Sequence, residues 1–411
     1  MPVRKQDEIS RTILRKRLDT VIPMAMRQAG LDMWLILCQE DDYDPIFRSM
    51  IPLRTWAPIL QMLVFFDRGP EQGIERINLS MTDLGDLFTK PWKGFHHIEQ
   101  WPFLAQLVAE RDPQRIGINI GSVQWAAGGL THNLYQQLCA ALPAPYVERL
   151  VSAEEACTVW LETLVEEELQ YYPSIVHLTH QIIQESFSPR ALIPGVTTTD
   201  DLQWAFWEYT LELGLEQDDI PFFYLARSPA RKQAFPLEDK IIRQGDMVRC
   251  DVVNRILRLH TDIQEWVYVR LPGEVDAPPG LKNLFTQVSR LQQIFMAEFT
   301  PGLTGNELLN RILARARTEG VPNPRVYSHS LGFYLHETGP LIGLPWEQQQ
   351  NPGRGDVKLV PNTTFTMELS IETEVPEWNN QPVRFSCEED VLFDGHTCRP
   401  MDQVQTAFYL S

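Results

Sequence analysis

The sequence of 411 residues predicts an α+β protein with a smaller α/β domain at the N-terminus and a larger second domain. Three observations support this prediction. Segments with helical and strand spacing alternate over the first third of the chain. Two similar helix-forming segments occur later, and each is followed by β-rich runs that contain acidic residues. We expect the domains to comprise residues 1–152 and 153–411, because both parts are long enough to bury a core.

The first domain opens with a helix. Residues 9–29 carry apolar side chains at helical spacing and end before Gly30, a typical helix stop. Further helices are predicted over residues 104–110 and 134–142. Three short, apolar, β-rich runs are predicted strands: Trp34–Cys38, Met62–Phe66 and Ile116–Ile120.

The second domain contains an internal similarity between residues 193–214 and 300–320. Each segment has Pro-Gly, then Thr, then an acidic residue three positions later, and closes with Gly. The Thr, the acidic residue and the closing Gly of one segment are each 106 residues from their counterparts in the other. The alternative is two unrelated capped helices, but several coincident positions favour a duplicated half-domain. Two pairs match the capping box, in which Thr and a carboxylate satisfy free backbone N–H groups: Thr198 with Asp201, and Thr304 with Glu307.

Strand-forming sequence follows each of these helices. The first half contains a predicted hairpin, and the second half contains three strand candidates. The predicted strands are Met247–Val253, Leu257–Val269, Thr364–Thr373, Val383–Cys387 and Asp390–Phe393.

Two acids of the predicted hairpin, Asp251 and Asp262, are eleven positions apart within apolar runs. A strand, a turn and a return strand of this length bring both carboxylates to one side. Either acid alone is typical of a surface or turn position. A carboxylate among valines is costly to bury unless it is paired or bound to a metal ion, so together they indicate a site.

Three further residues lie in short patterned segments downstream. His329 precedes His336 by seven positions, so two imidazoles could face one cleft. Glu368 lies among strand formers, and Glu388 enters another strand, where Glu389 is an alternative that the sequence alone hardly separates from it. Four carboxylates and one imidazole form a ligand set for two divalent ions, which would activate water for attack on an amide.

Composition and charge exclude several classes of protein. The net charge of −18 disfavours binding to nucleic acid. The six cysteines form no CxxC pair, which is typical of reduced thiols in a cytoplasmic protein. The N-terminus lacks the apolar region of a signal peptide, and no apolar run reaches the length of a bilayer span. We expect a cytoplasmic protein without a nucleic-acid or membrane partner.

In the order and local context of these residues, the chain resembles the pita-bread metallopeptidases, which include aminopeptidase P, prolidase, methionine aminopeptidase and creatinase-like enzymes. The resemblance covers residues 153–411 and implies a pita-bread catalytic domain. Residues 1–152 are similar to the creatinase-type N-terminal domain. The matching elements are Asp251, Asp262 eleven residues later, the segment HSLGFYLHETGP that contains His329 and His336, the TMEL acid Glu368 and the EEDVL acid Glu388.

The resemblance also implies roles. Asp251 would bind one ion, Asp262 and Glu388 would bridge both, and His329 and Glu368 would complete the other. His336, with His329 near it, would contact the substrate and stabilise the tetrahedral intermediate, and Glu368 would transfer protons. A shell rich in carboxylates favours Mn²⁺ and also admits Co²⁺, Zn²⁺ or Fe²⁺. Relatives are commonly homodimers, and small peptides or amides are the expected substrates.

The chain departs from the family pattern at three places. Val253 stands where relatives have Gly after the first acid, Glu265 replaces an Arg after the second, and Ala234 replaces a His of proline-specific relatives. The Xaa-Pro aminopeptidase or dipeptidase activity that the resemblance implies therefore has two alternatives. One is hydrolysis of a small non-peptide amide or modified amino acid, as in creatinase or ectoine hydrolase. The other is a catalytically silent pita-bread binding module.

Overall fold

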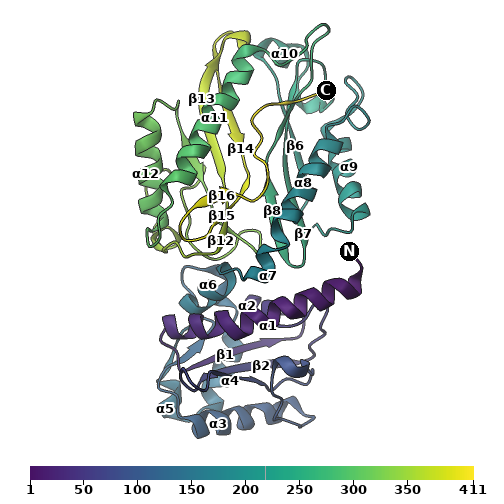
Figure 1. The fold of residues 1–411 in the computed structure, drawn as a ribbon. Helices are drawn as coiled ribbons and strands as arrows, with labels where there is room; N and C mark the ends of the chain where they lie inside the picture. Colours follow the sequence, from purple (N-terminus) through teal and green to yellow (C-terminus); the bar gives the residue numbers. More distant parts are fainter. Residues whose placement is uncertain (218) are drawn as a thin grey trace. The chain divides into compact units, whose positions relative to one another are not determined.

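The computed structural model describes residues 1–217 and 219–411 and divides the chain into two compact units, Met1–Glu168 and Leu169–Ser411 (Figure 1). The short helix α7 (Glu166–Leu169) spans the division. The strand β5 ends at Ser152, and α6 (Glu154–Glu162) still belongs to the first unit. The expected domain boundary at residue 152 stays a prediction. No helix among the described residues combines the length and the apolar character that a bilayer crossing requires.

The first unit is an α/β domain built on one five-stranded sheet with the order β3-β2-β1-β4-β5. The first three strands pair antiparallel, whereas β4 and β5 run parallel to β1. Leu35 of β1 belongs to the same core as Leu104 and Leu134 from the helices α3 and α4. The strands are β1 (Met33–Gln39), β2 (Leu60–Asp67), β3 (Ile74–Asn78), β4 (Ile116–Ile118) and β5 (Leu150–Ser152). The other helices are α1 (Val3–Gln28), α2 (Pro45–Met50), α3 (Gln100–Arg111), α4 (His132–Ala141) and α5 (Ala144–Val147).

Both predicted capping boxes of the second unit are present. The backbone N–H of Asp201 donates to Thr198 Oγ1 over 3.1 Å, and the N–H of Thr198 donates to the Asp201 carboxylate over 2.8 Å. Thr304 and Glu307 repeat this exchange at 3.2 and 2.8 Å. The helices of this unit are α8 (Tyr172–Ser186), α9 (Thr199–Glu212), α10 (Pro229–Ala234), α11 (Pro279–Glu298) and α12 (Gly305–Thr318).

Strands of the second unit form three sheets. Helices α8 and α9 pack on the strands of the first half, and α11 packs on those of the second half, as Figure 1 shows. The first sheet has the order β17-β9-β7-β6, with β8 paired to β7; the others are β10-β13-β14 and β11-β12-β15-β16. The strands are β6 (Phe222–Ala226), β7 (Met247–Ile256), β8 (Leu259–Ile263), β9 (Trp266–Tyr268), β10 (Arg325–Tyr327), β11 (Ser330–Leu331), β12 (Thr363–Thr366), β13 (Glu368–Val375), β14 (Gln381–Cys387), β15 (Asp390–Phe393), β16 (Cys398–Pro400) and β17 (Tyr409–Leu410).

The predicted hairpin is confirmed, with differences in detail. Its two-residue turn consists of Leu257 and Arg258, both with positive φ, at 55° and 70°. Such a turn matches the twist of a hairpin, although Asn and Gly are its usual residues. The predicted strand over residues 257–269 is divided into β8 and β9, and the one over 364–373 into β12 and β13. In both cases the chain changes its pairing partners within an apolar run, which local periodicity does not reveal.

An aromatic core supports the strand that ends at Glu388. Phe385 of β14 is fully buried and stacks on Trp266 with a centroid distance of 4.7 Å. Phe285 of α11 packs edge-to-face against the Phe385 ring, with a centroid distance of 4.9 Å. Because side chains alternate along a strand, Phe385 faces this core while Ser386 faces the opposite side of the sheet.

Replacing Phe385 by Ala leaves a cavity between α11 and β14. We expect the free energy of unfolding to fall by about 3–5 kcal/mol, measured by urea denaturation. Phe385→Leu keeps most of the apolar volume and is the matched control, with a smaller expected loss. Equal stability of the Ala variant and the unchanged protein would contradict the assigned core.

Candidate metal centre

The register of the hairpin places Asp251 and Asp262 on one face. Val253 of β7 lies directly opposite Asp262 of β8. Residues that are directly opposite share a face, as do residues two apart on one strand. Asp251 therefore projects to the same side as Asp262, as the eleven-residue spacing predicted.

A second row of side chains comes from the β10-β13-β14 sheet. Tyr327 is paired with Glu368, and Leu369 with Cys387, so the next position along the ladder sets Glu368 beside Glu388. Backbone hydrogen bonds of 3.1 and 3.3 Å then join Glu388 to Gln264, which follows β8. These bonds bring the acids of the two halves of the unit together.

All six residues that the sequence singled out line one cavity of about 550 Å³. Ligand atoms of Asp262, His329 and Glu388 lie within 4.8 Å of one another. His329 Nε2 is 3.8 Å from Asp262 Oδ2. Asp251, His336 and Glu368 complete the predicted set around the cavity. The sequence did not single out Tyr327, Gln264, Phe222 and Asp219, which also contribute to the lining.

His329 is oriented as a neutral nitrogen ligand. Its Nδ1 lies 3.0 Å from the carbonyl oxygen of Ser330, which only accepts hydrogen bonds, so Nδ1 carries the proton and Nε2 keeps its lone pair. Burial, with the neighbouring His336 ring, lowers the pKa of His329 to about 3. The centroids of the two rings are 4.6 Å apart. Burial also lowers the pKa of His336, which keeps that ring neutral.

The carboxylates of the cavity repel one another in a buried space. Burial, reinforced by neighbouring acids, raises the pKa of Asp262 and Glu388 well above the usual range. Burial raises the pKa of Glu368 to about 7. A cation is also near this group, because Arg249 Nη2 lies 3.7 Å from Asp251.

Glu388 provides a direct test of whether the site fits a metal ion. Its Oε2 accepts a hydrogen bond of 2.6 Å from the Gln264 side chain. Its Oε1 is buried and has no hydrogen-bond partner among the described residues. An unsatisfied buried carboxylate oxygen is costly unless a cation compensates it. Oxygen donors with one imidazole suit divalent ions such as Mn²⁺, Co²⁺, Zn²⁺ or Fe²⁺.

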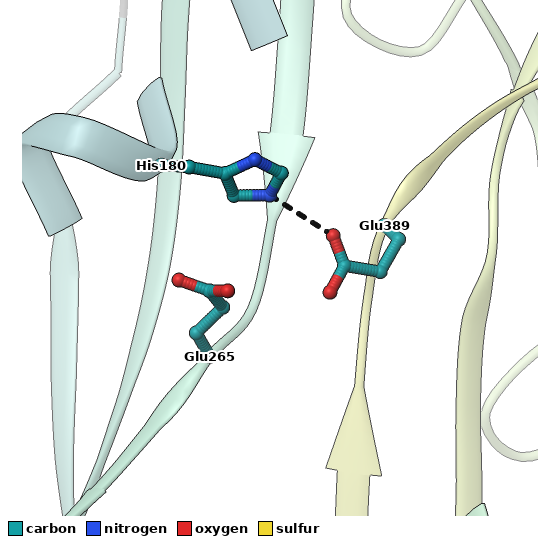
Figure 2. Close-up of side chains that lie close together, drawn as sticks. All are labelled: His180, Glu265 and Glu389. Carbon is teal, nitrogen blue, oxygen red and sulfur yellow. Dashed lines mark hydrogen bonds and ion pairs between the residues drawn. The ribbon is translucent and has the colours of Figure 1, made fainter. Parts of the chain in front are cut away.

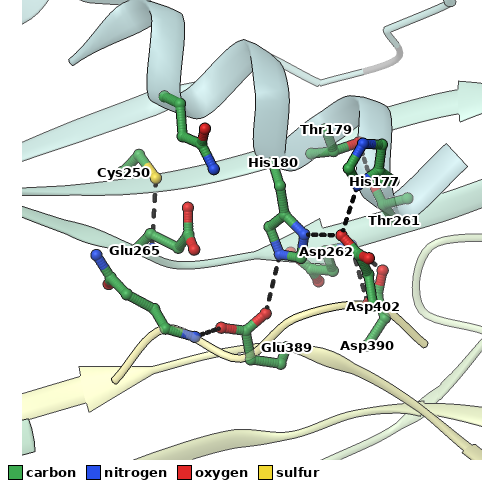
Figure 3. Close-up of polar contacts among 12 residues, drawn as sticks. His177, Thr179, His180, Cys250, Thr261, Asp262, Glu265, Glu389, Asp390 and Asp402 are labelled. Carbon is green, nitrogen blue, oxygen red and sulfur yellow. Dashed lines mark hydrogen bonds and ion pairs between the residues drawn. The ribbon is translucent and has the colours of Figure 1, made fainter. Parts of the chain in front are cut away.

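A second buried cluster consists of His180, Glu265 and Glu389, whose ligand atoms also lie within 4.8 Å of one another (Figure 2). Here the polar atoms already have partners. His180 Nε2 lies 3.1 Å from Glu389, and its Nδ1 lies 2.9 Å from Asp402 (Figure 3). The Tyr409 hydroxyl donates to Glu265, and the backbone N–H of Gln405 donates to Glu389. This cluster is a hydrogen-bonded charge network and does not require a metal ion.

His180 supplies the positive charge of that network. Burial is the largest single effect and opposes charging of the ring, but the hydrogen bonds and negative charges of Glu389, Glu265 and Asp402 together outweigh it and raise the pKa of His180 to about 9. Burial raises the pKa of Glu265 to about 8. Glu389 and Asp402, the hydrogen-bond partners of His180, lie more than two hundred residues away in the sequence. No local pattern identifies such a partner, although Glu265, an acid where relatives have Arg, indicated altered contacts.

The profile of metallopeptidase family M24 matches residues 174–395. No curated protein sequence matches the chain. The chain is similar to the solved structure of an X-Pro aminopeptidase from Thermotoga maritima MSB8, with 16% identity, coverage of 94% of this chain and 100% of that chain, and a TM-score of 0.66.

Two other solved structures have the same fold. An Xaa-Pro dipeptidase from Bacillus anthracis has 15% identity, coverage of 97% and 100%, and a TM-score of 0.63. The N-terminal domain of FACT complex subunit SPT16 from Cicer arietinum has 11% identity, coverage of 95% and 96%, and a TM-score of 0.60. These matches confirm the expected α+β architecture, with an α/β domain before a pita-bread domain.

The network around His180 predicts a pH-dependent stability. A group whose pKa rises on folding binds its proton more tightly in the native state, so its stabilisation is complete below its unfolded pKa and is lost as the pH rises through the folded value. For His180 this window runs from 6.5 to about 9, and Glu265 acts in the same direction between 4.5 and about 8. We expect the free energy of unfolding, measured by chemical denaturation at a series of pH values, to fall over pH 6.5–9.

At neutral pH, His180→Ala leaves buried acids without their cation. We expect it to lower the free energy of unfolding by about 3–5 kcal/mol. The matched control is His177→Ala, because His177 also contacts Asp402 but its side chain is 56% exposed. The control variant should lower the free energy of unfolding by less than about 1 kcal/mol. Equal effects of the two variants in chemical denaturation would refute the buried charge network.

Proposed function

The chain belongs to metallopeptidase family M24, and on that premise we propose that it is a hydrolase that uses two divalent metal ions to cleave an amide bond. The observation that supports this best is the buried Oε1 of Glu388, which has no hydrogen-bond partner within the described part of the chain and belongs to a group of like-charged carboxylates. Asp251, Asp262, His329, Glu368 and Glu388 are the residues that would hold the ions, and the resemblance implies that Asp262 and Glu388 would be shared between them. When bound, two such ions supply Lewis acidity and lower the pKa of a coordinated water molecule.

The remaining chemistry is assigned to side chains of the cavity. His336 is neutral, so a ring N–H can donate to the carbonyl oxygen of the substrate and stabilise the charge that develops there. Glu368 lines the same cavity and is assigned the transfer of a proton to the leaving amine. The cavity of about 550 Å³ has the size of a small-molecule site and suits a short peptide.

An Xaa-Pro aminopeptidase or dipeptidase is the favoured activity. Its support is the fold shared with an X-Pro aminopeptidase and an Xaa-Pro dipeptidase. The second candidate is hydrolysis of a small non-peptide amide or modified amino acid, and the observation that favours it is Ala234. This residue is exposed at the end of α10, where proline-specific relatives have a His. A panel of Xaa-Pro peptides, other dipeptides and N-acyl amino acids with Mn²⁺, Co²⁺ or Zn²⁺ distinguishes the two.

Asp262→Asn tests the shared ligand, because it preserves the volume of the side chain and removes its charge. We expect loss of bound metal together with a fall in kcat/KM of more than about 100-fold, since even residues beyond the ligands contribute 10–100-fold. Metal content by mass spectrometry and hydrolysis are the readouts. Asp276→Asn, at an exposed position of the same unit, is the matched control. A variant that retains full activity without metal would refute the proposal, and absence of both metal and hydrolysis in the unchanged protein would favour the silent binding module.

His336→Gln tests the proposed donor to the substrate. We expect kcat to fall by about 10²–10³-fold, as for loss of one donor to a developing oxyanion. Metal content should remain at the level of the unchanged protein, because His336 is not among the assigned ligands. A change in KM alone, with kcat preserved, would contradict stabilisation of the transition state.

A further inference from the structure

Next to the metal centre is a second, smaller cavity of about 260 Å³ whose lining includes three arginines, Arg249, Arg325 and Arg384. The two cavities share Tyr327 and Glu368 in their linings. We propose that this basic pocket binds a carboxylate of the substrate, and this inference rests on the proposed hydrolase function.

The strand register places the basic pocket directly beside the reactive row. Arg325 lies opposite Ser370, which lies opposite Ser386. Ser370 is two residues beyond Glu368 on β13, so both side chains project from the same face of the sheet. Two residues along a strand span roughly 7 Å. Arg325 is therefore one side-chain repeat from the row that contains Glu368 and Glu388, and Arg384, which is paired with Glu372, is one repeat further along.

A span of roughly 7 Å corresponds to about two residues of an extended peptide. A substrate with its scissile carbonyl at the Glu368 row can place a carboxylate in the basic pocket in two ways. The group is either the α-carboxylate of a residue beyond the leaving amine or the side chain of an Asp or Glu close to the bond. In both cases the group that binds the arginines is a planar carboxylate.

The guanidinium groups retain hydrogen-bonding capacity. Arg325 donates from Nη1 to the carbonyl oxygen of Pro345, at 2.6 Å, and has no carboxylate partner among the described residues. Arg384 donates from Nη2 to Glu372 over 3.0 Å, and Arg249 donates from Nη1 to Ser386. A guanidinium has five N–H donors and matches a carboxylate in two parallel hydrogen bonds. Donors therefore remain for a ligand at all three positions.

The charge balance of the pocket favours an anion. Its lining contains three arginines and one acid, Glu368, and the other nearby acids compensate only part of the positive charge. Arg384 forms an exposed ion pair with Glu372, and Arg249 lies 3.7 Å from Asp251. Exposed pairs contribute little and exchange readily with competing ligands. A concentration of positive charge beside the cavity contrasts with the net charge of −18 of the chain.

The test is calorimetric binding of non-hydrolysable peptides to the Mn²⁺-loaded protein and to its Arg325→Gln/Arg384→Gln variant. The ligands are a reduced-amide analogue of Ala-Ala-Gly, its C-terminal amide, and a reduced-amide analogue of Ala-Asp whose C-terminus is amidated. Arg317→Gln is the matched control, because it removes a positive charge from an exposed position on α12. Metal content and unfolding temperature of each variant report whether it is folded and loaded.

We expect the unchanged protein and the control to prefer at least one ligand with a carboxylate over the tripeptide amide. The double variant should lose roughly tenfold to hundredfold in affinity for that ligand and bind the tripeptide amide as before. Preference for the free C-terminus assigns the pocket to the α-carboxylate, and preference for the Asp analogue assigns it to a side chain. Equal binding of all three ligands, or equal binding by the double variant and the unchanged protein, would overturn the inference.

Hydrolysis of the corresponding natural peptides separates this inference from the proposed function. Cleavage without any preference for a carboxylate would contradict the proposed role of the basic pocket but would still support the hydrolase function. Arginine-dependent binding of the analogues without cleavage of any peptide or amide overturns the hydrolase. It still supports a carboxylate site.

Discussion

The second unit depends on the compensation of negative charges that its strands bring into one buried space. Asp251, Asp262, Glu368 and Glu388 line the same cavity, and burial raises the pKa of each. Hydrogen bonds satisfy only part of their oxygens. A pair of cations would convert this repulsion into attraction, because carboxylates can bridge two ions. Without such cations, burial of these carboxylates costs free energy of folding, so we interpret the cluster as a metal site and not as part of the core.

Strand alternation separates the acids of this region into two sets. Asp262 and Gln264 face the cavity, as does Glu388, whereas Glu265 and Glu389 project to the other side toward His180. On that side the chain provides its own cation and hydrogen-bond donors. On the cavity side it leaves Glu388 Oε1 without a partner among the described residues. The neighbouring residues Glu388 and Glu389 thus belong to two different groups of charges, the cavity on one face and the network around His180 on the other.

Local patterns in the sequence predicted much of this structure. The capping boxes at Thr198 and Thr304 depend only on neighbouring residues, and the spacing of Asp251 and Asp262 follows from one hairpin. The sequence could not decide whether Glu388 or Glu389 faces the cavity, because strand alternation alone allows either. The pairing of β13 with β14 decides it, because it sets Glu388 beside Glu368. The partnership of His180 with Glu389 joins segments 209 positions apart, which no local pattern encodes. The first helix begins at Val3, earlier than predicted, because Pro2 provides no side-chain capping signal.

Anomalous diffraction from crystals of the Mn²⁺-loaded protein shows whether the cavity holds two metal ions. The proposed binuclear centre predicts two manganese peaks in the cavity, with Asp262 and Glu388 in contact with both and His329 Nε2 in contact with one. A single peak, a peak at His180, Glu265 and Glu389, or no peak in the cavity at saturating Mn²⁺ would contradict it.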